Sequence, residues 1–233
     1  AILSVIVLHV ASTGAYLYGQ NPMSHWMIAN IVDSAVRCSV PLFLMLSGAL
    51  LLGNKETAKT FYAKRFTRVV IPFLFWSIIY TIIYVVFFLL KGKDVSFSEC
   101  VYNFVLCRGF FSQFAYHLWY VYVLLGIYLL TPILIRFISI KKSILLPVFL
   151  ICWIAALTLQ IVTYDKGGFI NYGAKFAGYI GYYFAGFFIS HIKLKNNVPN
   201  KIILSAISFA LILFTALTTY KLSTEQNNLV TYY

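Results

Sequence analysis

Long apolar runs separated by short polar breaks are the feature that most constrains this chain. Residues 69–90, for example, include no charged side chain. A helix of about 20 apolar residues is long enough to cross a hydrocarbon core of about 30 Å. The runs lack the period-two alternation of outer-membrane barrel strands. The pattern therefore predicts an all-α fold, a polytopic bundle of transmembrane helices.

The apolar runs predict seven membrane crossings. They are expected at residues 1–19, 33–53, 69–90, 117–137, 143–163, 173–192 and 202–219. Pro72, Pro132 and Pro147 lie near the ends of these runs, where a first-turn proline or a helix stop is tolerated. Pro41 lies deeper in the second run, and we expect it to kink that helix.

The composition places the chain in lipid. Of the 233 residues, 61% are hydrophobic and 10% are charged, with a mean hydropathy of +0.86. This balance is unlike that of soluble domains, so the cell (plasma) membrane is the expected location and membrane lipid the expected surroundings. The formal net charge of +12 does not indicate a nucleic-acid partner, because the basic residues lie mostly between the apolar runs.

The basic residues also predict an orientation. Eleven Lys and Arg residues lie in or beside the connections after the second, fourth and sixth runs, against six on the other side. By the positive-inside rule, the first group is cytoplasmic and the first helix runs outward from the cytoplasm.

The four cysteines suggest packing and not chemistry. Cys38, Cys100, Cys107 and Cys152 form no C-x-x-C pair and have no histidine at metal-ligand spacing. We therefore predict no metal site and no bound cofactor. Cys100 and Cys107 share one external connection and could pair, although small apolar packing residues are the favoured interpretation.

His9 is a polar side chain in the first apolar run, and no formally charged residue precedes Asp33. Polar groups inside a membrane are costly, so each one needs a reason. A neutral imidazole can take a proton from an attacking hydroxyl and return it later, which is general-base chemistry. A lone buried histidine is more often a hydrogen-bonding residue in helix packing, so both interpretations stay open on this residue alone.

Asp33 and Arg37 are four residues apart, and we expect them to share a helix face and neutralise each other. A structural ion pair near the external interface is the favoured interpretation. Gly48 continues the same face. With Ser47 it forms a small-residue patch that another helix or a ligand can approach closely.

Arg65 and Arg68 lie at the expected cytoplasmic entry to the third span. Two guanidinium groups three residues apart on a helix share a face and can bind phosphates in a bidentate manner. The positive-inside rule also demands basic residues at this place, so the phosphate site is one of two interpretations.

His117, Trp119 and Tyr120 open the fourth span at the expected external interface. Trp and Tyr are common at that depth. His117 is less usual there and could orient a substrate, although a plain interfacial role is the simpler interpretation. His25 and His191, near other span ends, are also interpreted as interfacial.

In order and spacing, these elements resemble the integral-membrane acyltransferase family three, whose members acylate cell-surface polysaccharides and related molecules. His9 looks like the histidine of the family's first helix, and VPLFLMLSG at residues 40–48 is similar to its V-P-L-F-F-M-x-S-G run. Arg65 and Arg68 fall where the family carries R-x-x-R. The segments HLWY at 117–120 and YYFAGFF at 182–188 are similar to its H-L-W-F/Y and late aromatic-glycine stretches.

The resemblance implies an O-acetyltransferase-like enzyme of bacterial type. It would move an acetyl (acyl) group from a cytosolic acyl-CoA donor, with acetyl-CoA as co-substrate, to a hydroxyl of a cell-surface glycan or small polar acceptor. Arg65 and Arg68 would hold the donor phosphates, and His9 would be a general base or an acyl relay. The candidates to bind or support the acceptor are Arg37, Ser47, Gly48, His117, Trp119 and Tyr120.

Two departures from the family pattern concern the ends of the chain. The basic residue that the family carries eleven positions before the histidine would fall before residue 1, and family members have about ten spans. The chain also starts with Ala inside an apolar run. We therefore expect residues 1–233 to form a single membrane acyltransferase-like domain that lacks segments at both ends.

Other functions also fit intramembrane His and Arg residues. A membrane transporter or exporter of a glycan or small polar substrate would place such groups along its path, although no inverted repeat is visible in the sequence. A membrane sensing domain of a larger protein is a third possibility. Donor turnover that depends on His9 would separate the enzyme from both alternatives.

Overall fold

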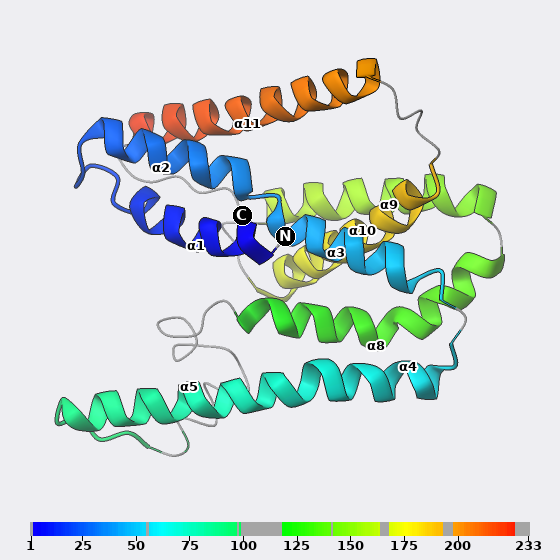
Figure 1. The fold of residues 1–233 in the computed structure, drawn as a ribbon, viewed down its shortest axis with the longest axis horizontal. Helices are drawn as coiled ribbons and strands as arrows, with labels where there is room; N and C mark the ends of the chain where they lie inside the picture. Colours follow the sequence, from blue (N-terminus) through cyan, green and yellow to red (C-terminus); the bar gives the residue numbers. More distant parts are fainter. Residues whose placement is uncertain are drawn as a thin grey trace. The chain divides into compact units, whose positions relative to one another are not determined.

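The structure is a computed structural model that describes residues 2–54, 56–96, 98, 118–140, 142–163, 168–192 and 198–226. Every regular element in these ranges is a helix, as the all-α prediction requires (Figure 1). The elements are α1 (Ile2–Ala15), α2 (Met23–Val36), α3 (Ser39–Leu51), α4 (Ala58–Arg65), the π-helical turn η1 (Phe66–Val70), α5 (Ile71–Leu90), α8 (Trp119–Ile140), α9 (Lys142–Val162), α10 (Gly168–Ser190) and α11 (Val198–Gln226).

Each of the seven predicted spans contains a helix, but the bounds differ. α2 lies mostly before the predicted second span, which α3 occupies, and α4 lies before the third, which α5 occupies. The number of membrane crossings stays a prediction. Within the described residues, four stretches are long and apolar enough to cross a membrane: Met23–Leu51, Ala58–Leu90, Trp119–Ile138 and Val198–Glu225. Leu3–Ala15 and Leu146–Val162 are apolar but shorter. The predicted fold class, that of a helical membrane protein, is confirmed.

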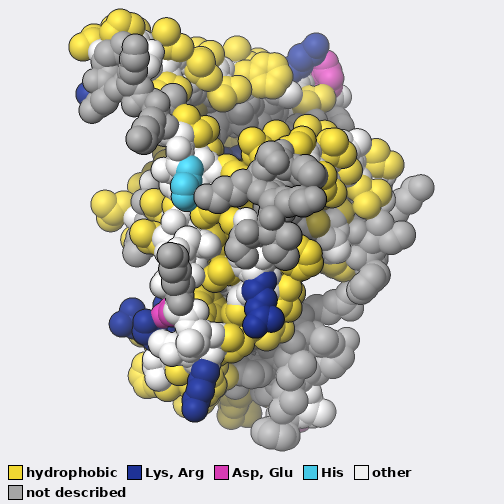
Figure 2. All heavy atoms as spheres, turned by 90° about the vertical axis from the view of Figure 1, so that its right-hand side faces the viewer, with side chains coloured by type: hydrophobic (Ala, Val, Ile, Leu, Met, Phe, Trp, Pro, Cys, Tyr) yellow, Lys and Arg dark blue, Asp and Glu magenta, His cyan; other side chains and the backbone are white. Residues whose placement is uncertain are grey.

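Many large apolar side chains point outward from these helices. Leu90 is 83% exposed and Leu3 78%, and Figure 2 shows hydrophobic side chains over much of the described surface of one face. Such a surface would be unfavourable in water but is matched by lipid tails. The outer faces of the helices are therefore suited to a membrane.

By its internal contacts, the chain divides into two units, one of Ala1–Ala49 with Tyr182–Tyr233 and one of Leu50–Gly181. The division falls within α3 and within α10, so the first unit joins two separate segments and the second is one continuous segment. The expectation of a single domain over residues 1–233 stays a prediction.

In the first unit, α2 packs on both α1 and α11 (Figure 1). Trp26 is only 1% exposed, and its indole N–H donates to the carbonyl of Ala15 over 2.9 Å. The side-chain amide of Asn30 donates to the carbonyl of Ala216 on α11, also over 2.9 Å. Side-chain hydrogen bonds between helices are a main source of specificity where lipid removes the hydrophobic contrast. These two bonds fix the register of three helices.

The predicted kink at Pro41 is a break between two helices. Proline has no N–H to donate to the carbonyl four residues earlier, which here belongs to Arg37. The α2 helix ends at Val36, and the first turn of α3 closes with a bond from the Leu42 N–H to the Cys38 carbonyl over 2.9 Å. The second span is therefore a discontinuous segment with Arg37 at its joint.

Also in the first unit, two glycines bring α3 against the carboxyl-terminal part of α10. A Cβ on Gly48 would collide with the backbone carbonyl of Tyr183, and a Cβ on Gly186 with that of Met45. Tyr183 is fully buried at this contact. Small residues let helix backbones approach closely in membranes. Here each helix has one glycine that lies against the backbone of the other helix.

In the second unit, α4, η1 and α5 form one continuous helical rod, with α8 packed beside it (Figure 1). The rings of Phe73 and Tyr122 meet edge to face, with centroids 5.0 Å apart. Nearer the start of the rod, the hydroxyl of Tyr62 donates to the carbonyl of Leu129 on α8 over 2.8 Å. These contacts place the basic amino-terminal end of the rod on α8.

The substitution Gly48→Ala tests the close helix contact of the first unit. We expect it to lower the free energy of unfolding by about 1–3 kcal/mol, because overpacking forces backbone shifts. Thermal unfolding of the detergent-purified protein, followed by intrinsic fluorescence, measures the effect. Gly173→Ala is the matched control, since an added Cβ there meets no atom within 4 Å. Equal midpoints for the two variants would contradict the close packing.

Candidate functional site

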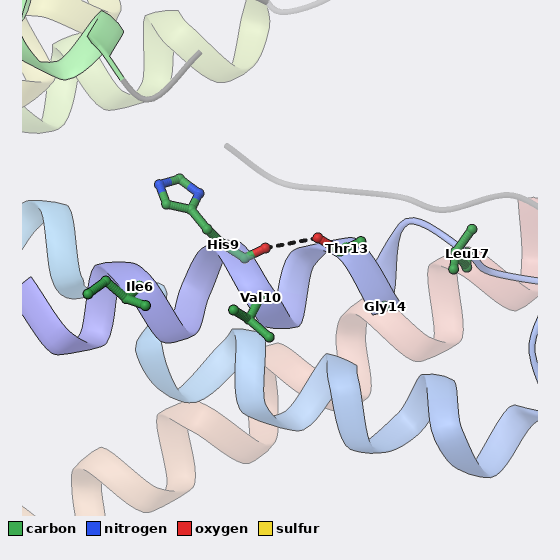
Figure 3. A pocket seen from close by; sticks show the side chains of 6 residues that line it. All are labelled: Ile6, His9, Val10, Thr13, Gly14 and Leu17. Carbon is green, nitrogen blue, oxygen red and sulfur yellow. Dashed lines mark hydrogen bonds between the residues drawn. The ribbon is translucent and has the colours of Figure 1, made fainter. Parts of the chain in front are cut away.

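His9 lies on α1 and lines a shallow groove of about 560 Å³ (Figure 3). The groove residues lie along α1 and in the turn that follows it. They are Ile6, His9, Val10, Thr13, Gly14 and Leu17. Most of this lining is apolar, and its polar side chains are His9 and Thr13.

The imidazole of His9 projects away from the axis of α1, on the other side from Val10 (Figure 3). The hydroxyls of Ser12 and Thr13 donate to the His9 backbone carbonyl, each over 3.0 Å. Those bonds engage the carbonyl and not the ring. The side chain is partly buried, which agrees with a predicted role either in helix packing or in chemistry.

The predicted ion pair between Asp33 and Arg37 is confirmed. The Arg37 Nε–H donates to Oδ2 of Asp33 over 2.9 Å, and a second guanidinium N–H donates to the same oxygen. Asp33 is only 3% exposed. Arg37 is the C-cap residue of α2, where the helix dipole favours a cation. The pair therefore lies at the joint between α2 and α3.

Two buried hydroxyls lie on either side of Arg37 along the chain. Ser34 ends the last turn of α2 and Ser39 starts α3, and within the described residues neither Oγ atom has a hydrogen-bond partner. A buried hydroxyl without a partner costs about 1–3 kcal/mol. The sequence analysis missed both serines, although their position on either side of Arg37 was a usable signal.

The small-residue patch of α3 is occupied by a helix on one side. Gly48 faces the backbone of Tyr183, which is the helix-packing alternative of the two that the sequence left open. Ser47 is partly buried on the same helix. Gly48 thus has a packing role, whereas its predicted support of an acceptor stays a prediction.

Arg65, the last residue of α4, has three close partners. Its guanidinium carbon lies 4.8 Å from the ring centroid of Phe61 and 5.7 Å from that of Tyr128 on α8. One Nη atom lies 3.6 Å from a carboxylate oxygen of Glu56, whose other oxygen pairs with Lys64. The Arg65 side chain is 14% exposed. Sequence reasoning missed Glu56, although it is the one acidic residue among residues 55–68.

Arg68 lies in different surroundings from Arg65. It is exposed, and it belongs to the π-helical turn η1. A π turn is wider than an α turn, so residues three apart do not keep the shared face expected of an α-helix. Such turns are rare and often mark functional sites. The R-x-x-R pair is therefore asymmetric.

The aromatic residues at the start of α8 pack in part on α10. The ring of Trp119 lies 5.6 Å from that of Tyr179, centroid to centroid, and 6.2 Å from that of Tyr120. Trp119 is 38% exposed. His117 lies outside the described residues, so its predicted role stays a prediction.

The described cysteines, Cys38 and Cys152, are free thiols. Cys100 and Cys107 lie outside the described residues, and the prediction about their pairing is untested. In the part of the chain that the structure describes, no group of three or more His, Cys, Asp or Glu residues is placed to hold a metal ion.

The substitution Asp33→Ala tests the ion pair at the helix joint. We expect it to lower the free energy of unfolding by up to about 3 kcal/mol, because it removes a buried counter-charge from Arg37. The double variant Asp33→Ala/Arg37→Ala should recover part of the loss. Asp94→Ala, at an exposed position, is the control. Thermal midpoints in detergent are the readout, and a midpoint for Asp33→Ala equal to that of Asp94→Ala would exclude a stabilising pair.

Comparison with known proteins gives the family. The model of a family described as an acyltransferase domain, the acyltransferase 3 family, matches residues 1–233, the whole chain. No curated protein and no solved structure matches the chain. The family match agrees with the resemblance drawn from His9, the 40–48 run and the R-x-x-R pair, and with the apolar helices of the fold. The chain therefore belongs to the acyltransferase 3 family, and it is a membrane acyltransferase.

Proposed function

We propose that the protein moves an acetyl or other acyl group from a cytosolic acyl-CoA, acetyl-CoA in the first instance, to a hydroxyl of a cell-surface glycan or small polar acceptor. The plasma membrane is the proposed location. Family membership supports acyl transfer in general. The observation that carries the proposal is the partly buried imidazole of His9, which lies on α1 and lines a mostly apolar groove.

His9 is the proposed catalytic residue, and two routes use the same ring. As a general base, the imidazole takes the proton of the acceptor hydroxyl while the oxygen attacks the thioester carbonyl. The C–S bond then breaks, and the coenzyme A thiolate takes up the proton. As a relay, a ring nitrogen first attacks the thioester carbonyl and displaces the thiolate; the acceptor oxygen then attacks the acyl-imidazole, the N–C bond breaks, and the hydroxyl proton passes to the thiolate.

The basic segment of α4 and η1, which contains the R-x-x-R motif, is the proposed binding site for the donor phosphates. Lys59 and Arg68 are exposed in α4 and η1, and Lys64 is 47% exposed. Guanidinium and ammonium groups at one end of a helical rod suit the several negative charges of coenzyme A. The π-helical turn at Arg68 supports a site here, because such turns often have functional roles.

Two groups of residues are the candidates to bind the acceptor, polar groups of α2–α3 in the first unit and aromatic groups of α8 in the second. Arg37 and the hydroxyls near the helix joint can donate to acceptor oxygens or to a developing oxyanion. Ser47 is kept as a further polar candidate. Trp119 and Tyr120 can supply flat apolar surfaces of the kind that line ligand sites, and His117 remains a candidate to orient the acceptor. Gly48 is kept as a supporting residue, in addition to its packing on Tyr183.

Transport without chemistry is the second candidate. The discontinuous α2–α3 segment, with a buried ion pair at its joint, is a feature that transporters use to bind polar substrates. The whole-chain family match favours acyl transfer over this alternative. The two differ in one measurable property, which is consumption of the acyl donor.

The substitution His9→Ala tests the proposed catalytic residue. We expect acetyl-CoA turnover by the full-length protein in membranes to fall about a hundredfold or more, because general acid–base catalysis contributes about 10²–10⁴ in rate. Acetyl-CoA binding should be retained. Release of coenzyme A, measured with candidate acceptors at matched expression, gives the rate.

The control is His25→Ala, because His25 is an exposed histidine at the start of α2 outside the groove. Its turnover should match that of the wild type. Equal rates for wild type and His9→Ala would remove His9 from the mechanism. Wild-type membranes that never consume an acyl donor would favour transport.

A further inference from the structure

We infer that the two arginines of the R-x-x-R motif have different tasks. Arg68 contacts the donor phosphates, whereas Arg65 is a positioning residue that holds the start of the helical rod on α8. The inference rests on the proposed function, because it takes an acyl-CoA as the ligand. It is argued from residues of the second unit alone.

The surroundings of Arg65 are those of a packed side chain. Its guanidinium lies near two aromatic rings, that of Phe61 on α4 and that of Tyr128 on α8. These rings meet edge to face, with centroids 6.0 Å apart, and Phe61 is only 1% exposed. Arginine stacks favourably on aromatic faces, most strongly where water is excluded. Arg65 thereby joins α4 to α8.

The same surroundings make Arg65 a poor partner for an external phosphate. A bidentate contact uses two parallel N–H groups of the guanidinium fork. The Nε–H of Arg65 is buried and has no hydrogen-bond partner among the described residues, so this edge of the fork is enclosed by the protein although it is unsatisfied. The Glu56 side chain is 8% exposed and lies against Arg65, with Lys64 on its other oxygen. A phosphate brought to Arg65 would meet this fixed carboxylate at short range.

Arg68 has none of these constraints. It is exposed, and among the described residues it forms no ion pair. Arg68 lies in the wider turn of η1 and Arg65 at the end of α4, so the two do not have the relative direction that residues three apart have in a regular α-helix. Arg68 and the exposed Lys59 give this part of the rod positive charge that Glu56 does not neutralise. Of the two motif arginines, Arg68 is the one that a dissolved anion can reach.

Binding and stability, measured separately on the full-length protein in detergent, test this division. Acetyl-CoA affinity is measured by calorimetry, and stability by the thermal midpoint. We expect Arg68→Ala to weaken binding about tenfold or more, the size of a charge-assisted hydrogen bond, with an unchanged midpoint. Arg68→Lys should restore most of the affinity. Arg65→Lys should lower the midpoint and change the affinity less than about threefold, since it keeps the charge but loses the stacked plane.

A double-mutant cycle adds a readout that a general loss of charge would not produce. Glu56→Gln and Arg65→Lys should be non-additive in their effects on the midpoint, because the two side chains are in contact. Glu56→Gln and Arg68→Ala should be additive. If Arg65→Lys does not fold, Phe61→Leu replaces it, since that change removes one of the stacking rings and keeps Arg65.

Two results would overturn the inference. The first is an Arg65→Lys variant that loses acetyl-CoA affinity as strongly as Arg68→Ala at an unchanged midpoint. The second is a double variant, Glu56→Gln/Arg65→Lys, whose change in thermal midpoint equals the sum of the changes in the two single variants. If the wild type binds no acetyl-CoA, the proposed function fails and the assignment of Arg68 fails with it. The midpoint cycle still decides separately whether Arg65 is a positioning residue.

Discussion

The high cost of leaving a polar group unsatisfied in hydrocarbon governs this protein from backbone to site. It requires the spanning backbone to be helical. It also explains why buried polar side chains in the first unit have partners: Trp26 and Asn30 donate to carbonyls, and Asp33 pairs with Arg37. Against this background, the partnerless hydroxyls of Ser34 and Ser39 stand out. A polar group that lipid penalises and packing does not use is a reasonable place to look for a substrate.

The family motifs combine packing with chemistry. Gly48 and Gly186 belong to motif runs, yet in the structure they bring two helix backbones together. Arg65 belongs to the R-x-x-R pair, yet its guanidinium lies between aromatic rings and a carboxylate. Helices that have no hydrophobic driving force between them need such residues where they meet.

Local patterns in the sequence predicted most of the fold. Span positions followed from apolar runs, and the Asp33–Arg37 pair from a spacing of four, because both depend on residues close in the chain. The break at Arg37 was predicted only as a kink at Pro41. The missing N–H of proline indicates where a helix is disturbed, but not whether it bends or ends there. The contact of Arg65 with Tyr128 on α8 joins residues far apart in the chain. The spacing of residues within α4 could not predict it. The roles of His9, Arg68 and the acceptor residues remain predictions, and His117 lies outside the described residues.

The joint between α2 and α3 has a mechanical consequence. On one side of it, α2 is tied to α1 through Trp26 and to α11 through Asn30; on the other, α3 is tied to α10 through paired glycines. The two helices pack on different partners and meet at Arg37. Pro41 has no N–H to donate to the Arg37 carbonyl, so the backbone hydrogen bonding is interrupted there. Bending of this span would concentrate there, so the charged pair sits at the most compliant point of an otherwise rigid segment.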